Sequence, residues 1–227
     1  MHNFATWDEA YQFEGIHCRI AIDSPTDDIV IVRISGSDVG EFGQAPLNRL
    51  KNYLSDDQQV ELFIDARYAK AASIEVSNEW ALWLGAHRSR IKVINMLTGS
   101  KFVEVTAGFV RMFSSLENNM RIYTDAKSFD EALTTSLLKA FPTLSSVGRN
   151  SNEINQSLGN VIKVLRIVRN MSQENLAEIC DLDKSFISDV EKGKQPLEFE
   201  MIIRLADALS IKPSKLISLF EGVGGAG

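Results

Sequence analysis

The residues best suited to chemistry in this chain gather in residues 171–193, which read MSQENLAEICDLDKSFISDVEKG. Four polar residues would share one side of a short helix there: Lys184, Ser185, Ser188 and Asp189. Ile187 and Val190 lie three positions apart, so they would form the opposite, buried side of that helix. An ammonium group and two hydroxyls can donate hydrogen bonds, so the polar side is free to bind a partner.

Two short helices joined by a tight turn would position this polar side. The first begins at Ser172, a capping residue type, although Ser172 with Asn175 does not make the usual capping box. The turn spans residues 180–182, and Asp183 would cap the second helix. Gly193 would end the second helix, because glycine adopts a left-handed conformation at little cost. Two short helices meeting at a steep angle form a helix-turn-helix.

This arrangement resembles the helix-turn-helix of phage-repressor-type (Xre-like) DNA-binding domains, over about seventy residues. Four segments carry the resemblance: 158–166 (LGNVIKVLR), 172–177 (SQENLA), 187–194 (ISDVEKGK) and 202–211 (IIRLADALSI). It implies an all-α, lambda-repressor-like domain that binds double-stranded DNA. In that family's docking, the side chains facing base edges in the major groove would be Lys184, Ser185 and Ser188. Those facing phosphates would be Gln173, Lys192 and Lys194.

Three residues depart from the family's pattern. Asp181 stands where the turn often has glycine, and Pro196 falls one place earlier than the usual proline. Asp189 belongs to the predicted DNA-facing residues, but it stands at a position that is commonly basic or an amide. Phosphate contacts supply most of the binding free energy, so the carboxylates of Asp181 and Asp189 lower the affinity that we expect.

The charge balance is acidic for a DNA-binding chain. The 227 residues carry a net charge of −6. Residues 149–227 hold 10 Lys and Arg against 11 Asp and Glu, a net charge of −1. A duplex-binding domain is more often basic, so local positive charge would have to supply the attraction. The residues expected to do so are Arg166, Arg169, Lys184, Lys192 and Lys194.

Length and composition suit one large or two small globular domains, with 44% hydrophobic residues. The sequence contains no run of about 18 apolar residues that would suggest a membrane span. The start, MHNFATWDEA, lacks the basic and apolar regions of a secretory signal. We therefore expect a cytoplasmic protein without a membrane partner. Cys18 and Cys180 fall in separate predicted domains, so we expect two free thiols.

The periodicity of residues 17–141 predicts strands alternating with helices. Strands are predicted at residues 17–23, 29–35, 60–65, 91–97 and 120–124, and helices at residues 46–54, 76–86, 103–113 and 128–141. The first two strands would form a hairpin, and the others need helical crossovers, so the sheet would be mainly parallel with an antiparallel edge. This order resembles the STAS fold of anti-sigma-factor antagonists over roughly residues 15–141, on topology and spacing alone.

Asp65 is the carboxylate that the STAS resemblance singles out. Phospho-regulated members carry an Asp-Ser-Ser/Thr-Gly motif after the third strand, and Asp65 matches its aspartate. The regulatory serine is absent, so the fold would be shared without the phosphorylation switch. Asp65 would lie where open sheets bind ligands, but a helix cap or an ion pair with Arg67 explains it equally well.

Other candidate sites favour structural roles. His2, His17 and His87 are not spaced with a Cys, Asp or Glu as metal ligands would be, and His87 lies near a helix C-terminus, which attracts a partial positive charge. Trp80 and Trp83 have helical spacing, which is more typical of a core or a partner surface than of a ligand pocket. We therefore expect no catalytic residue, no cofactor and no metal site, and hence no enzyme.

The predicted organisation is an α/β STAS-like sensor or assembly domain (residues 1–141), a linker (142–157), a helix-turn-helix domain (158–221) and a flexible tail (222–227). The predicted function is that of a sequence-specific, double-stranded DNA-binding transcriptional regulator acting as a homodimer. Its N-terminal domain would take a small ligand or a protein partner. The alternative is a STAS-type signalling scaffold that binds a protein partner, with the helix-turn-helix as an adaptor.

Overall fold

The computed structural model describes residues 10–54, 58–113, 118–141 and 150–222. It divides into two compact units, Glu9–Ala132 and Leu133–Gly227. The division falls inside a helix, whereas the sequence predicted a boundary after residue 141. No helix in the described ranges is both long and apolar enough to cross a membrane.

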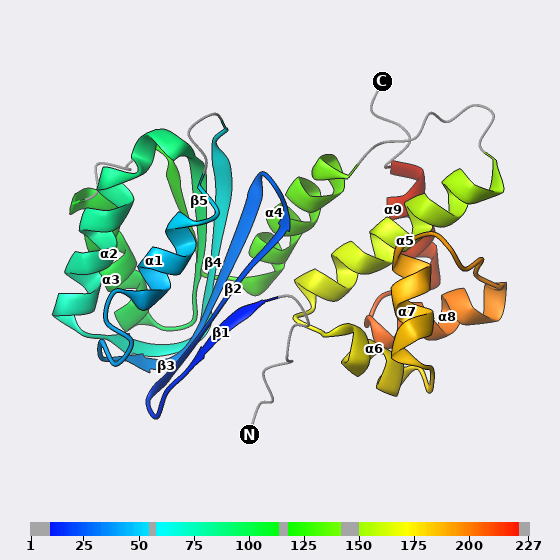
Figure 1. Cartoon of the computed structure of the whole chain (residues 1–227), viewed down its shortest axis with the longest axis horizontal. Helices are drawn as coiled ribbons and strands as arrows, with labels where there is room; N and C mark the ends of the chain where they lie inside the picture. The colour runs from blue at the N-terminus through cyan, green and yellow to red at the C-terminus, as the bar shows by residue number, and fades with distance from the viewer. Residues whose placement is uncertain (1–9, 55–57, 114–117, 142–149, 223–227) are drawn as a thin grey trace. The chain divides into compact units, whose positions relative to one another are not determined.

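The N-terminal unit is built on one six-stranded sheet whose strands lie in sequence order (Figure 1). The strands are β1 (Tyr11–Glu14), β2 (Cys18–Thr26), β3 (Ile29–Asp38), β4 (Val60–Ala72), β5 (Ile91–Thr98) and β6 (Met120–Tyr123). β1, β2 and β3 pair antiparallel, and β3 to β6 pair parallel. The predicted mixed sheet is confirmed. β1 was not predicted, and it takes the edge position expected for β2.

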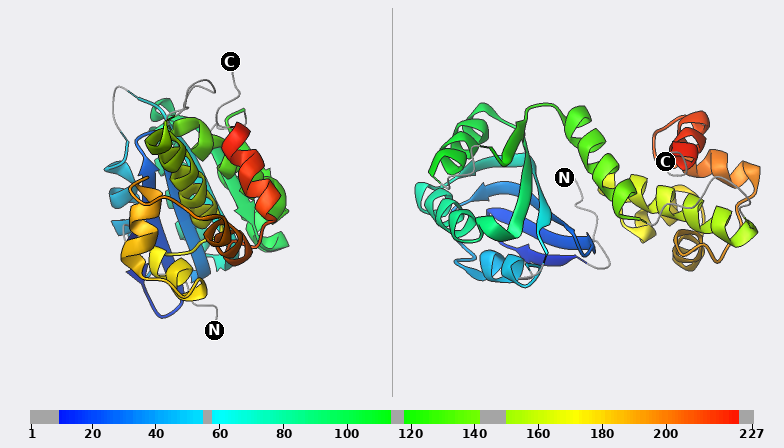
Figure 2. Two further views of the ribbon diagram at one scale, coloured as in Figure 1. Left: turned by 90° about the vertical axis from the view of Figure 1, so that its right-hand side faces the viewer. Right: turned by 90° about the horizontal axis from the view of Figure 1, so that it is seen from above.

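Helices cover both faces of this sheet (Figure 2). They are α1 (Ala45–Lys51), α2 (Ile74–Ala86), a short 3-10 turn η1 (Arg88–Arg90), α3 (Lys101–Phe113) and α4 (Ala126–Ala140). On one face, Leu62 and Ile64 of β4 are buried in a cluster with Leu84 of α2 and Val110 of α3. On the other face, Phe63 meets Phe129 of α4 edge-on, with ring centroids 5.8 Å apart. Alternating side chains of one strand thus supply both cores.

β4 runs seven residues beyond its predicted end at Asp65. The extension, ARYAKAA, holds four alanines, which are weak strand formers. Its backbone is nevertheless paired with β3, because Ser35 lies opposite Tyr68 and Asp38 lies opposite Ala72. Pairing with a neighbouring strand overrides the weak local preference, so Asp65 lies inside a strand and not at its carboxyl end.

Five helices make up the described part of the C-terminal unit after residue 149. They are α5 (Ser151–Val168), α6 (Gln173–Ile179), α7 (Lys184–Glu191), α8 (Phe199–Ala208) and α9 (Pro213–Gly222). The predicted linker is wrong for residues 151–157, because these form the first turns of α5. Asn150 and Glu153 make a reciprocal capping box there, which fixes the helix start in spite of the polar composition. Residues 142–149 and 223–227 of the predicted linker and tail lie outside the described residues.

The helices of this unit enclose one apolar core. Side chains from all five meet in it, and those of Leu176, Ile187, Leu205 and Leu216 are fully buried. α5 and α7 approach each other closely at Gly159, where an added Cβ atom would lie 2.1 Å from the carbonyl oxygen of Val190. Only glycine fits at that position, so α7 can rest directly on the α5 backbone.

Candidate nucleic-acid interface

The start of α6 is fixed by a reciprocal cap. The hydroxyl oxygen of Ser172 accepts a hydrogen bond from the Asn175 backbone N–H at 2.9 Å, and the Asn175 side-chain oxygen accepts one from the Ser172 backbone N–H at 3.3 Å. The sequence predicted no full capping box between Ser172 and Asn175. The structure corrects this reading, since an amide oxygen can accept the same bond as a carboxylate.

The turn between α6 and α7 is tight. Asp181 takes a left-handed conformation, with φ of +49°, where the related domains often have glycine. The backbone N–H of Leu182 donates to the Ala177 carbonyl oxygen at 2.9 Å and closes the end of α6. Gly193, with φ of +67°, ends α7 as predicted. Asp183 occupies the cap position of α7, but its side chain makes no capping hydrogen bond.

α7 carries the predicted polar face. Ile187 and Val190 are buried on its inner side. The predicted residues share the outer side because they follow rows four positions apart: Lys184, Ser188 and Lys192 in one row, and Ser185 and Asp189 in the next. All are exposed except Ser188, which is half-buried, and Lys194 is exposed just beyond the helix. The Lys192 ammonium donates to the Ser188 hydroxyl oxygen at 2.8 Å.

Gln173 is the first residue of α6, and its side chain reaches α7. Its amide nitrogen donates to the Glu191 carboxylate at 2.8 Å, so the amide is held where the two helices meet. The bond uses one of the two amide N–H groups and leaves the side-chain oxygen as an acceptor. A phosphate contact from Gln173 stays a prediction. The Glu191 carboxylate helps to hold the Gln173 side chain in place.

Glu191 is itself held by Arg166 of α5. The Arg166 guanidinium meets the Glu191 carboxylate with two hydrogen bonds, at 2.5 and 2.9 Å, and donates a third to the Met171 carbonyl oxygen at 2.9 Å. Both side chains are buried. Arg166 was predicted to supply local positive charge, and this is wrong, because its charge is neutralised in the core. The two residues lie 25 positions apart, so no local sequence pattern indicates that they pair.

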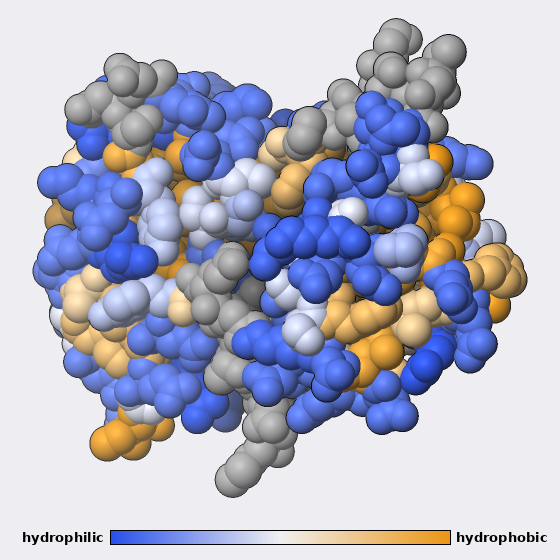
Figure 3. Space-filling model, turned by 45° about the vertical axis from the view of Figure 1, so that its right-hand side comes forward, coloured by the Kyte–Doolittle hydropathy of each residue, from blue (hydrophilic) through white to orange (hydrophobic). Residues whose placement is uncertain are grey.

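Exposed charges of both signs lie around α7. Lys184, Lys192 and Lys194 are exposed, and so are three carboxylates nearby in sequence, those of Asp181, Asp183 and Asp189. Arg169 is also exposed, and its guanidinium donates to the Leu209 carbonyl oxygen at 3.1 Å. Space-filling colours show a mainly hydrophilic surface with separate hydrophobic patches (Figure 3). The surface around α7 is therefore not strongly basic, so a large excess of positive charge is not what would attract DNA to this unit.

The candidate residues of the N-terminal unit have the structural roles that the sequence favoured. Arg67 pairs with Asp65 at 2.9 Å and with Asp130 of α4 at 2.6 Å, which confirms the ion-pair reading of Asp65. The His87 ring nitrogen Nδ1 lies 2.8 Å from the Trp83 carbonyl oxygen at the end of α2, as its helix-terminal position predicted. Within the described ranges, no three His, Cys, Asp or Glu side chains are grouped to hold a metal ion.

Cys18 and Cys180 are both buried and free, one in each unit, as predicted. His17 is exposed while Cys18 is buried, so the two do not form a nucleophile and base pair. Trp80 and Trp83 are half-buried and pack against the core of the N-terminal unit. The two cysteines and the two tryptophans therefore serve mainly in packing.

Comparison with known proteins identifies the C-terminal unit. The helix-turn-helix family matches residues 162–216. The control protein C.BamHI of Bacillus amyloliquefaciens is 35% identical over 68 residues, which are 30% of this chain and 84% of that protein. The control protein C.SmaI of Serratia marcescens is 33% identical over 66 residues, 29% of this chain and 79% of that protein.

One similar solved structure is the restriction-modification controller protein C.AhdI of Aeromonas hydrophila. It has 36% sequence identity and a TM-score of 0.27, and the match covers 27% of this chain and 92% of that one. The family match falls on the unit that contains the capped α6, the tight turn and the polar face of α7. Through this C-terminal unit, the chain belongs to the helix-turn-helix family of DNA-binding transcriptional regulators.

Proposed function

We propose that this protein is a sequence-specific regulator that reads double-stranded DNA with α7. The observation that carries the proposal is the division of α7 into two sides. Ile187 and Val190 lock its inner side into the core, and its outer side keeps hydroxyl and ammonium groups exposed. A helix that is held rigidly from behind can present such groups to base edges in the major groove.

The residues of the interface divide into two roles. Those placed for base contacts are Lys184, Ser185 and Ser188, at the start and middle of α7. Those placed for phosphates are Gln173, Lys192 and Lys194, at the start of α6 and the end of α7. Asp189 lies on the same exposed side and opposes phosphates nearby. Its carboxylate would reject incorrect sequences more than it adds affinity, because a carboxylate accepts hydrogen bonds only from base donors.

A single copy of this unit would bind weakly. Its net charge is −1 over residues 149–227, so attraction to DNA phosphates contributes little binding free energy. Arg166 is buried and does not add to this attraction. Two copies bound to half-sites about 34 Å apart, or a multiple of this, would make the second contact intramolecular. Avidity would then rise by roughly 10²–10⁴. We therefore propose a homodimer, with the N-terminal STAS-like unit as the assembly or sensing part.

Selection of bound duplexes from a random library by the full-length protein tests the function. We expect one enriched sequence with twofold symmetry, and affinity for it that falls steeply with salt. A library that stays random after several rounds, together with no salt-dependent retention on random DNA, would instead favour a protein-binding adaptor.

A further inference from the structure

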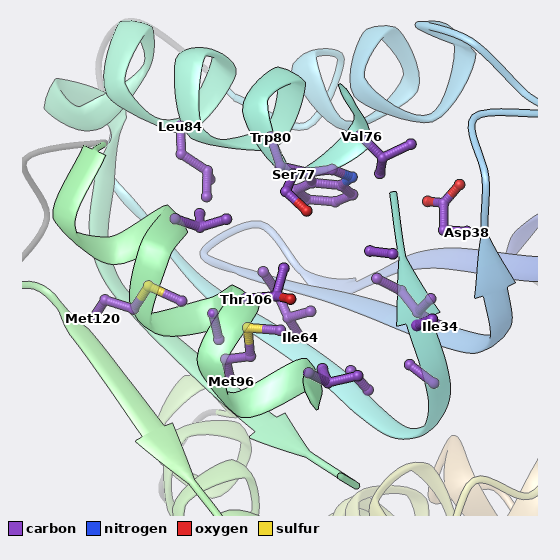
Figure 4. A pocket seen from close by; sticks show the side chains of 17 residues that line it. Ile34, Asp38, Ile64, Val76, Ser77, Trp80, Leu84, Met96, Thr106 and Met120 are labelled. Atoms are coloured by element: carbon purple, nitrogen blue, oxygen red, sulfur yellow. The ribbon is translucent and has the colours of Figure 1, made fainter. Parts of the chain in front are cut away.

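The N-terminal unit contains a cavity between its sheet and two helices. The cavity has a volume of about 70 Å³. Its floor is formed by β3, β4, β5 and the start of β6, and its cover by α2 and α3 (Figure 4). Ser77 and Trp80 approach it from α2, and Thr106 from α3. All of its lining residues belong to Glu9–Ala132, so the cavity depends on this unit alone.

Small side chains create the space. Five alanines line the cavity, four of them from β4: Ala66, Ala69, Ala71, Ala72 and Ala107. The remaining lining is almost entirely apolar, and an apolar cavity tends to stay dry. A cavity of about 150 Å³ accommodates benzene. The present cavity is about half as large, so it matches a branched aliphatic group of roughly four carbons.

One charged group lines this apolar space. Asp38, at the end of β3, is 7% exposed. In the figure it lies at the same end of the cavity as Val76, while Leu84 and Met120 lie at the opposite end (Figure 4). Its carboxylate oxygen Oδ1 accepts one hydrogen bond, from the Gly40 backbone N–H at 3.1 Å. Within the described parts of the chain, Asp38 has no cationic partner.

The surroundings of Asp38 are acidic. Burial raises the pKa of the Asp38 carboxyl group, and the nearby carboxylates of Glu41 and Glu79 raise it further. A buried carboxylate is stable in its charged form only when a cation or several hydrogen bonds compensate for lost water. The single hydrogen bond from Gly40 compensates only in part. The Asp38 carboxylate could therefore still pair with a positively charged ligand and accept further hydrogen bonds from it.

Two polar groups of the cavity also favour a donor over an acceptor. The Ser77 hydroxyl donates its hydrogen to the Ser73 carbonyl oxygen at 2.7 Å. What Ser77 still offers to the cavity is therefore the lone pairs of its oxygen. Asp38 and Ser77 both accept hydrogen bonds, whereas a carboxylic acid would bring a further negative charge beside the carboxylates of Asp38, Glu41 and Glu79.

We propose that this cavity is a binding site for a small aliphatic amine, with the branched hydrocarbon among the alanines and the ammonium group on Asp38. The ligand class follows from two observations together: the size and apolarity of the space, and a nine-tenths buried carboxylate at its end that pairs with no cation among the described residues. Such a site would let the N-terminal unit respond to an amine-bearing metabolite. The inference does not depend on DNA binding by the C-terminal unit.

Titration of the ¹⁵N-labelled full-length protein with isobutylamine tests the site. At neutral pH the amine is almost entirely protonated. For a ligand of five heavy atoms, we expect a dissociation constant on the order of millimolar. Amide shifts should saturate and centre on β4, α2 and α3. Isobutanol, which has the same shape without charge, should bind at least tenfold more weakly to the unmodified protein.

Three variants locate the binding. Asp38→Asn keeps the shape of the side chain and should weaken isobutylamine binding at least tenfold. Asp27→Asn removes a charge from the exposed turn between β2 and β3, and it should change binding less than twofold. Ala69→Val fills part of the cavity with a residue that suits a strand, and it should weaken the binding of both probes.

Several results would overturn the proposal. Equal binding of isobutanol and isobutylamine would show an apolar void without an ammonium site, and this comparison needs no variant to fold. Shifts spread over acidic surface residues and insensitive to Asp38→Asn would show unspecific charge attraction. A loss of stability in Asp38→Asn with unchanged affinity would show that the carboxylate serves only the turn at Gly40, whose backbone N–H donates to it.

Discussion

The Arg166 guanidinium and the Glu191 carboxylate form a buried ion pair, with its two hydrogen bonds at 2.5 and 2.9 Å, between α5 and α7. Gln173 of α6 donates to the same carboxylate at 2.8 Å. One buried carboxylate thus joins three helices and fixes the angle at which α7 is presented. In our proposal, exposed lysines contact the DNA. Glu191, which is buried, fixes the position of the helix that carries them.

Glu191→Gln should destabilise the C-terminal unit by about 3–5 kcal/mol, because it leaves the Arg166 charge buried without a counter-charge. Hydrogen exchange of α5 and α7 peptides in the intact chain would measure the loss. The double variant Arg166→Met with Glu191→Leu is the matched control. It removes both charges together and should cost much less. Equal losses in the two variants would show that packing around these residues matters, and not their pairing.

Lys184→Ala and Lys194→Ala should have different effects on DNA binding. Lys184 lies at the start of α7 in our base-reading set, so its loss should weaken binding to the selected sequence by about 1–3 kcal/mol and affect random DNA less. Lys194→Ala should weaken binding to all duplexes and reduce the salt slope by about one. Fluorescence anisotropy across a salt series measures both. Identical losses on selected and random DNA for both variants would contradict the assigned roles.

Asp189→Asn should tighten binding to random duplex DNA by roughly three- to tenfold, because it removes a negative charge that opposes phosphates. The side chain is exposed on the reading side of α7, so the substitution should leave folding unchanged. Asp27→Asn, an equal charge change in the N-terminal unit, controls for net charge. If both variants tighten binding equally, Asp189 does not lie near the DNA.

Cys18 should resist thiol reagents at neutral pH in the folded protein. Burial raises the pKa of its thiol to about 12, and Asp38 and Glu41 add to the shift. Between about pH 9 and 12 the unfolded chain loses this proton while the folded chain keeps it. The free energy of unfolding should therefore fall with rising pH in that window and be unaffected by Cys18 below it.

A Cys18→Ala variant should show a flatter loss of stability above about pH 9. Alkylation of the native protein, followed by mass spectrometry, checks the reactivity. Rapid labelling of Cys18 at neutral pH would contradict the shift, and the second buried thiol, Cys180, provides the comparison within the same sample.

The full-length protein should sediment as a dimer, and a fragment of residues 133–227 should sediment as a monomer that binds the selected sequence roughly 10²–10⁴ times more weakly. The fragment begins at residue 133 because Leu138 packs against the core of the C-terminal unit and the Lys163 ammonium lies over the Phe141 ring. A fragment that is already dimeric, or that binds as tightly as the intact chain, would assign another role to the N-terminal unit.

The sequence alone determined the elements whose signals are local. Ser172, Gly193 and the spacing of Ile187 and Val190 located the two helices of the motif, because caps and periodicity act within a few residues of the chain. Alternating strands and helices predicted the mixed sheet for the same reason. The four-residue β1 had no such signal, since its short strand depends on pairing with β2.

Only the tertiary structure decided the rest. Arg166 and Glu191 are 25 positions apart, so no local pattern could show that one of the expected surface charges is buried. Asp65 became an internal strand residue because pairing with β3 extends β4 past a weak strand sequence. Asp38 carried no distinguishing motif, and its isolation beside an apolar cavity exists only once α2 and α3 close over the sheet. These relationships arise from packing between distant segments, and packing is a property of the folded chain.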